Sequence, residues 1–179
     1  MLLTILQNGL SGVWMKVKEL LKEKKEGLYA AVRFSSETVD RIVQFAFEND
    51  IPNLLKVEDF HSTMAYSRVP VPKFTPISNI DEIGIPTSFE IWASPPNAFK
   101  EEETHCLVLK YDCDYMHKRF DEIMSMGATY DYDEYKPHMT ISYDVGKDFD
   151  VKKLPKASDI GKLHIVNEYT EILDLDKTF

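Results

Sequence analysis

The sequence predicts an α+β domain made of two pseudo-symmetric halves that face a central cleft. Three observations support this fold class. The succession of a strand, an amphipathic helix and a second strand occurs twice along the chain. Each time the second strand begins with a His-x-Thr tripeptide, at 61–63 and at 138–140. No linker-like stretch divides the 179 residues, so we expect a single domain over 1–179.

The first predicted elements are a short helix and a buried strand. Apolar residues at helical spacing among lysines and glutamates indicate an amphipathic helix over 13–25. Gly27 is expected to end that helix, and the apolar run 28–34 then predicts a strand. Residues 1–26 lie outside the repeated pattern, and we interpret them as an N-terminal extension.

The rest of the first half contains a helix, the first motif strand and a loop. Ser35 or Ser36 can cap the helix, because a side-chain oxygen there accepts from a free backbone N–H group. The motif strand runs on to Ser67, and three prolines over 70–76 predict a loop. Alternating residues over 87–94 predict a further strand.

The second half repeats this order. We expect a strand over 104–111, a helix over 114–126 and an acidic, aromatic loop over 130–135. The second motif strand over 138–143 follows, and 163–175 supplies a last strand or hairpin.

Composition narrows the classes of function. The chain has 30 acidic and 21 basic residues and a net charge of -9, whereas a binder of long nucleic acid normally needs a basic face. A small anionic ligand in a locally positive pocket remains compatible with this charge. No apolar run reaches the length of about 18 residues that a membrane span needs, and the start of the chain has no basic leader. We expect a cytoplasmic protein, and its oligomeric state stays open.

The tripeptides carry the predicted chemistry. Side chains in a strand alternate between faces, so His61 and Thr63 share one face, as do His138 and Thr140. Two imidazoles can take a proton from one oxygen and give a proton to another, as metal-free phosphodiester cleavage requires. The two threonine hydroxyls can stabilise the charge that develops on the phosphate oxygens. Because no cluster has the spacing of metal ligands, we expect neither a metal nor a cofactor.

At these residues the chain resembles the 2H phosphoesterase superfamily, which is defined by two H-x-[ST] motifs. The resemblance implies two lobes of antiparallel sheet, with helices outside and a cleft between the lobes. Within the superfamily the chain is most similar to the phage anti-CBASS phosphodiesterases, through the sequences at 27–34, 60–67 and 135–143. These proteins cleave cyclic di- and trinucleotide messengers, such as 3′,3′-cyclic GMP-AMP and cyclic tri-adenylate, that trigger bacterial antiphage defence.

The resemblance also implies roles for further residues. Tyr29 and Trp92 would be platforms on which the bases of the substrate stack. Glu134 and Glu168 would accept a hydrogen bond from an adenine amino group. The ligand would be a small cyclic oligonucleotide, encountered in the cytoplasm of the host bacterium.

Several alternatives use the same residues. The two histidines would also serve a 2′-5′ oligoadenylate phosphodiesterase, or an enzyme that acts on 2′,3′-cyclic phosphate ends of RNA. The last of these would favour a basic track for RNA, which the sequence lacks. A protein of another class would bind the cyclic nucleotide as a sponge without cleaving it. Both tripeptides are intact, which argues for catalysis.

Overall fold

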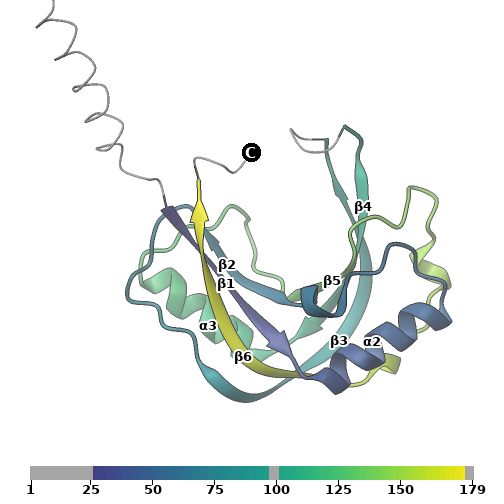
Figure 1. The fold of residues 1–179 in the computed structure, drawn as a ribbon, viewed down its shortest axis with the longest axis horizontal. Coiled ribbons are helices and arrows are strands. Elements are labelled where there is room, and N and C mark those ends of the chain that lie inside the picture. Colours follow the sequence, from purple (N-terminus) through teal and green to yellow (C-terminus); the bar gives the residue numbers. More distant parts are fainter. Residues whose placement is uncertain (1–25, 97–100, 176–179) are drawn as a thin grey trace, which may run out of the picture.

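The computed structural model describes residues 26–96 and 101–175 as one antiparallel sheet flanked by two helices (Figure 1). The predicted helix over 13–25 lies outside the described residues. The strands, in chain order, are β1 (Glu26–Phe34), β2 (Ser62–Ser67), β3 (Ser78–Ser94), β4 (Thr104–Asp112), β5 (His138–Ser142) and β6 (Leu163–Asp174). The helices are α2 (Ser36–Glu48) and α3 (Asp114–Ser125). In the described part of the chain, neither helix has the length and apolar character needed to cross a bilayer.

The order of the strands confirms the two pseudo-symmetric halves. The sheet runs β2-β1-β6-β3-β4-β5. Exchanging β1 with β4, β2 with β5 and β3 with β6 gives the same order read backwards. Each half is therefore a strand, a helix and two further strands, and the central pair β6 and β3 joins the halves. The two motif strands, β2 and β5, are equivalent and form the two outer edges of the sheet.

The sheet curls until its outer edges meet. The ribbon has the outline of a U, with both helices on its convex side (Figure 1). Ser62 Oγ in β2 donates a hydrogen bond of 2.6 Å to the carbonyl of His138 at the start of β5. The backbone N–H group of Leu55 likewise donates to the carbonyl of Ile141, at 3.0 Å. These contacts bring together two motifs that lie far apart in the sequence.

Each helix buries an apolar stripe against the outside of the sheet. In α2 the ring of Phe45 stacks on Phe89 of β3, with their centroids 5.2 Å apart. The side chain of Ser35 accepts a hydrogen bond from the Thr38 N–H group, so Ser35 is the N-cap of α2. In α3 the buried stripe includes Met116 and Ile123.

Two strands differ from the predicted ones in extent. The strand predicted over 87–94 begins earlier, at Ser78, and β3 has 17 residues. Its first part is largely exposed and polar, so it carries no alternating pattern that would reveal a strand. Residues 163–174 form one strand, β6, because pairing with β1 continues from Phe34↔Ile165 to Glu26↔Asp174 and leaves no room for a hairpin turn.

Gly84 lies where β3 passes from one half of the sheet to the other. It pairs with Leu163 of β6, while the next residue, Ile85, pairs with Asp112 of β4. A Cβ atom at Gly84 would lie 2.6 Å from Cδ2 of Tyr111, a ring that is fully buried. The bend of β3 therefore requires that the ring of Tyr111 and the backbone approach each other closely.

We expect Gly84→Ala to lower the free energy of unfolding by about 1–3 kcal/mol, because the added methyl group overpacks a rigid ring. Urea denaturation measures this loss. Ser78→Ala, at the exposed start of the same strand, is the matched control and should change stability by less than about 0.5 kcal/mol. An unchanged unfolding midpoint in Gly84→Ala would show that Tyr111 gives way without cost.

Candidate active site

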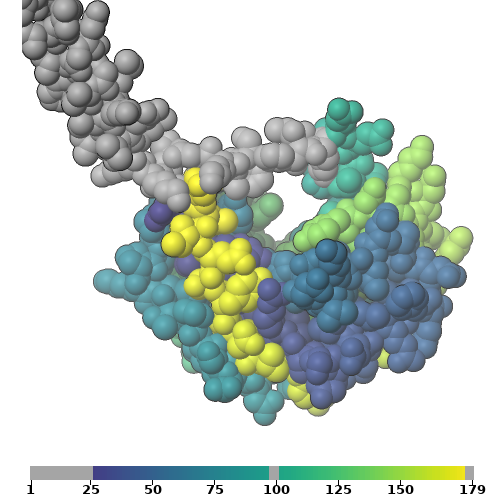
Figure 2. Space-filling model, in the orientation of Figure 1, coloured from purple at the N-terminus to yellow at the C-terminus, as the bar shows by residue number. Residues whose placement is uncertain are grey.

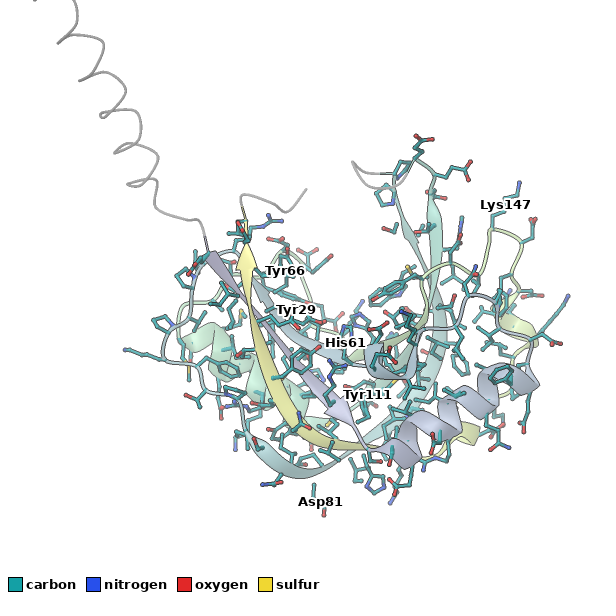
Figure 3. The ribbon with its side chains drawn as sticks, in the orientation of Figure 1. Tyr29, His61, Tyr66, Asp81, Tyr111 and Lys147 are labelled. Atoms are coloured by element: carbon teal, nitrogen blue, oxygen red, sulfur yellow. The ribbon has the colours of Figure 1, made fainter. Side chains whose placement is uncertain are left out.

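The two tripeptides have the same local geometry. The middle residue of each, Ser62 in one and Met139 in the other, is buried, while the flanking histidine and threonine are half-buried. The alternation predicted for a strand therefore holds at both motifs. Figure 3 shows His61 on the concave side of the sheet, together with Tyr29 and Tyr66.

Both histidines are oriented by a backbone carbonyl two residues before them. Nδ1 of His61 lies 2.6 Å from the carbonyl oxygen of Asp59, and Nδ1 of His138 lies 2.8 Å from that of Lys136. A carbonyl oxygen can only accept, so Nδ1 carries the proton in both rings. Nε2 is then the nitrogen available for proton transfer: it accepts a proton in the neutral ring and donates one from the imidazolium.

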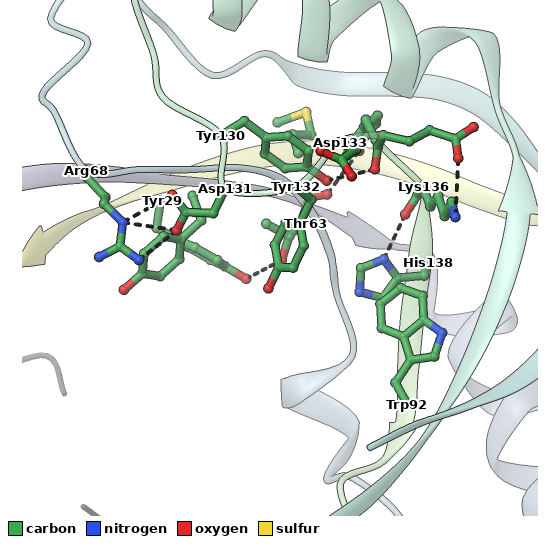
Figure 4. A pocket seen from close by; sticks show the side chains of 14 residues that line it. Tyr29, Thr63, Arg68, Trp92, Tyr130, Asp131, Tyr132, Asp133, Lys136 and His138 are labelled. Carbon is green, nitrogen blue, oxygen red and sulfur yellow. Dashed lines mark hydrogen bonds and ion pairs between the residues drawn. The ribbon is translucent and has the colours of Figure 1, made fainter. Parts of the chain in front are cut away.

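A cavity of about 960 Å³ lies on the concave side (Figure 4). In the space-filling view this face is hollowed between the yellow β6 and the green residues opposite (Figure 2). The cavity is lined by 14 residues, which include five of the predicted site residues: Tyr29, Thr63, Trp92, Glu134 and His138. His61 and Thr140 belong to the same two motifs but do not line this cavity, and neither does Glu168.

Each motif has an aromatic neighbour that the sequence singled out. The hydroxyl of Tyr29 lies 3.1 Å from Oγ1 of Thr63, and its ring meets His61 edge-on at 6.0 Å between centroids. Trp92 lies against His138, with their ring centroids 4.3 Å apart. Tyr29 and Trp92 thus each lie beside one motif, and their predicted stacking on a base stays a prediction.

Trp92 is held in place by an ion pair. Its indole N–H group donates to Glu90, at 2.9 Å, and Glu90 also accepts from Nζ of Lys110, at 2.9 Å. The hydrogen bonds from Trp92 and Lys110 lower the pKa of Glu90 below its usual range, so the carboxylate stays charged. The orientation of the indole against His138 is therefore fixed before any ligand arrives.

Two charged residues that line the cavity, Arg68 and Asp131, were not predicted from the sequence. Arg68 forms a bidentate ion pair with Asp131, with N···O distances of 2.6–3.2 Å. Tyr66, Tyr130 and Tyr132 also line the cavity. The loop over 130–135 stood out as acidic and aromatic, but Arg68 is 63 residues away from Asp131 and no spacing signal connects them.

Glu134 lies on the rim of the cavity. Its side chain is largely exposed and pairs with Nζ of Lys136 at 3.2 Å. Its predicted contact with an adenine amino group stays a prediction.

The role predicted for Glu168 is wrong, because its side chain is buried on the opposite side of β6. Its carboxylate accepts hydrogen bonds from Arg119, at 2.6 and 2.7 Å, from the hydroxyl of Tyr115, at 2.7 Å, and from the N–H group of Ile77, at 2.9 Å. The side chain of Glu168 is 0% exposed. A carboxylate with all these partners ties α3 to β6 and has no free edge for a base.

Among residues 26–96 and 101–175, no group of three or more histidine, cysteine, aspartate or glutamate side chains is placed to hold a metal ion.

Removing the partner of Glu168 should destabilise the fold. Arg119→Met leaves a carboxylate buried without its guanidinium, and the expected loss in the free energy of unfolding is about 3–5 kcal/mol. Glu122→Gln is the matched control, since Glu122 also pairs with Arg119 but is 38% exposed; the expected loss there is below about 1 kcal/mol. Urea unfolding measures both. Equal losses in the two variants would contradict a structural role for the buried pair.

The pKa of His138 is lowered, chiefly because burial disfavours the imidazolium; a positive charge on His61 acts in the same direction. The unfolded chain, with a histidine pKa of about 6.5, therefore takes up this proton first as the pH falls. We expect the free energy of unfolding to fall below about pH 6.5, and to fall less in His138→Gln. Urea unfolding at several pH values tests this. An NMR titration midpoint of His138 at or above about 6.5 would contradict it.

A protein family and several curated proteins are similar to this chain. The family model described as "Anti-CBASS protein Acb1" matches residues 26–179. The Acb1 protein of Yersinia phage phiR1-RT is 36% identical over 154 residues, which cover 86% of this chain and 93% of that protein. The Acb1 protein of Enterobacteria phage T4 is 35% identical over 157 residues, covering 87% and 93%.

One solved structure supports the fold. A crystal structure of a phosphoesterase superposes with a TM-score of 0.50 at 9% identity, covering 81% of this chain and 86% of that chain. At this identity the likeness concerns the fold alone. The resemblance expected from the motifs is confirmed, and the chain belongs to the anti-CBASS Acb1 family.

Proposed function

We propose that this protein is a metal-independent phosphodiesterase that cleaves 3′-5′ bonds of cyclic di- and trinucleotide messengers. One observation carries the proposal: two histidines on equivalent, adjoining strands expose the same nitrogen, Nε2. Membership of the anti-CBASS family supports cyclic oligonucleotides as the substrate class. Within this proposal the protein acts in the cytoplasm of the infected bacterium and removes the signal for antiphage defence.

The proposed reaction is an in-line displacement at phosphorus. The ribose 2′-oxygen attacks the adjacent phosphorus while one imidazole removes its proton. The bond from phosphorus to the 5′-oxygen breaks, and the other imidazolium protonates that oxygen. The first product is linear and ends in a 2′,3′-cyclic phosphate and a 5′-hydroxyl. Each proton transfer contributes roughly 10²–10⁴-fold in rate.

The surroundings of the two histidines favour one assignment of these roles. Burial lowers the pKa of His138, so its neutral form predominates at neutral pH and suits the general base. His61 is then the general acid. The hydroxyls of Thr63 and Thr140 are the proposed donors to the non-bridging oxygens.

The cavity suits a small ligand rather than a polymer. Its volume of about 960 Å³ is at the upper end of the usual range for small-molecule pockets. Aromatic rings line it, among them Trp92 beside His138 and the side chains of Tyr66, Tyr130 and Tyr132. Two or more bases of a ring-shaped nucleotide would each find a ring to stack on, at roughly 1–3 kcal/mol per base.

The test is a substrate panel in the presence of excess EDTA. The panel contains 3′,3′-cyclic GMP-AMP, cyclic tri-adenylate, linear 2′-5′ oligoadenylate and an RNA with a 2′,3′-cyclic phosphate end, and mass spectrometry identifies the products. We expect only the cyclic compounds to be linearised. Turnover of only the linear or RNA substrates would replace the proposed substrate class. Tight binding without turnover would make the protein a sponge.

His61→Ala and His138→Ala should each lower kcat by about 10²-fold or more, because each removes one proton transfer. The double variant should be little slower than either single variant, since the two groups act as a unit. His164→Ala is the matched control: His164 is exposed on β6 and does not line the cavity. A near-normal rate in either motif variant would refute the two-histidine mechanism.

A further inference from the structure

Arg33 contacts the segment that leads into the first motif. It lies on β1, two positions after Ala31 and four after Tyr29, so it shares the concave face with both. Its Nη1 group donates to the carbonyl of Glu58 and, at 3.5 Å, to the carbonyl of Phe60. Its guanidinium also lies over the ring of Tyr169, 4.4 Å from the centroid.

The two carbonyls flank the one that orients His61. Residues Val57–Asp59 form a 3₁₀ turn, and the carbonyl of Asp59 accepts from Nδ1 of His61 at 2.6 Å. Carbonyls at the end of such a turn lack partners inside it, and a cationic side chain can supply the missing donors. By holding the carbonyls before and after Asp59, Arg33 fixes the direction of the carbonyl between them.

The second half shows what stands at the equivalent position. Ala31 of β1 pairs with Thr63, and Val108 of β4 pairs with Thr140, so Ala31 and Val108 are equivalent. The residues two positions later, Arg33 and Lys110, are therefore equivalent as well. Lys110 does not hold the segment before His138 but pairs with Glu90 at 2.9 Å.

In the second half the backbone holds the corresponding segment: the N–H group of Tyr111 donates to the carbonyl of Pro137, at 3.2 Å, just before His138. Across the described residues Arg33 has no carboxylate partner, so its guanidinium remains available for carbonyls. The segment before His61 is thus held by a side chain, whereas the segment before His138 is held by a backbone hydrogen bond.

We propose that Arg33, supported by Tyr169, is a positioning residue for His61: it holds the Asp59 carbonyl so that His61 keeps its proton on Nδ1 and exposes Nε2. The inference deepens the proposed function and rests on it for its catalytic consequence. A lysine replaces Arg33 only in part, because its ammonium group lacks the planar face with which the guanidinium stacks on the ring of Tyr169.

The test combines NMR and kinetics on the full chain. In protein with ¹⁵N-labelled histidine, the wild type should show His61 with its proton on Nδ1. Arg33→Met should give a mixture of the two tautomers at His61 and leave His138 unchanged. With a cyclic nucleotide that the wild type cleaves, kcat should fall on the order of 10- to 100-fold while KM stays nearly the same.

Arg41→Met is the matched control. Arg41 also donates to two backbone carbonyls, those of Ile160 at 3.0 Å and of Lys162, but it does so from α2 on the outside of the sheet. This variant should leave the His61 tautomer and kcat unchanged. Arg33→Lys should lie between the wild type and Arg33→Met in both measurements, and it decides the question if Arg33→Met does not fold.

Three results would overturn the proposal. The first is an unchanged His61 tautomer in the Arg33 variants, even if kcat falls. The second is a rise in KM at constant kcat, which would make Arg33 a substrate-binding residue. The third is the same tautomer change in Arg41→Met. Failure of the wild type to cleave any cyclic nucleotide would refute the proposed function, while the tautomer measurement would still decide the role of Arg33.

Discussion

The site depends on the meeting of the two outer edges of one curved sheet. Nothing in the local sequence of either motif brings them together; the order of six antiparallel strands does, because it places β2 and β5 at the ends of a sheet that curls on itself. Ser62, the middle residue of the first motif, links the two edges through its hydrogen bond to the carbonyl of His138. The residue between His61 and Thr63 therefore joins the two edges, while its two neighbours are half-buried on the other face of β2.

The two halves are equivalent in backbone but not in charge. A cation stands at the same position in each, Arg33 in one and Lys110 in the other. Its partner across the sheet is an aromatic ring in the first half and a carboxylate in the second. The carboxylate, Glu90, holds Trp92 against His138. Two similar backbones thus place the two histidines in different surroundings, and the proposed mechanism assigns them different roles, one as acid and one as base.

Features that depend on neighbouring residues could be predicted from the sequence. The alternation at the tripeptides follows from the period of a strand, and the cap at Ser35, one of two serines that the sequence offers, follows from capping chemistry. Glu168 was misplaced because a strand residue can face either side, and the partner that decides, Arg119, is 49 residues away. Arg68 was not predicted for the same reason, since its partner Asp131 is 63 residues away. The first part of β3 was not predicted because its exposed residues show no alternation of apolar and polar side chains.

The symmetry of strand order has a consequence for the chain's connectivity. Glu26 and Asp174, the first residue of β1 and the last residue of β6, lie opposite each other in neighbouring strands. A linker between these points, with an opening between β3 and β4, would give a circular permutant whose order of elements is β4-α3-β5-β6-β1-α2-β2-β3. This permutant has the same succession of a strand, a helix and two strands, with the two histidines exchanged in order along the chain. For such a fold, the order of the two halves along the chain can change, while the order of the strands in the sheet, which places β2 and β5 at its two edges, stays the same.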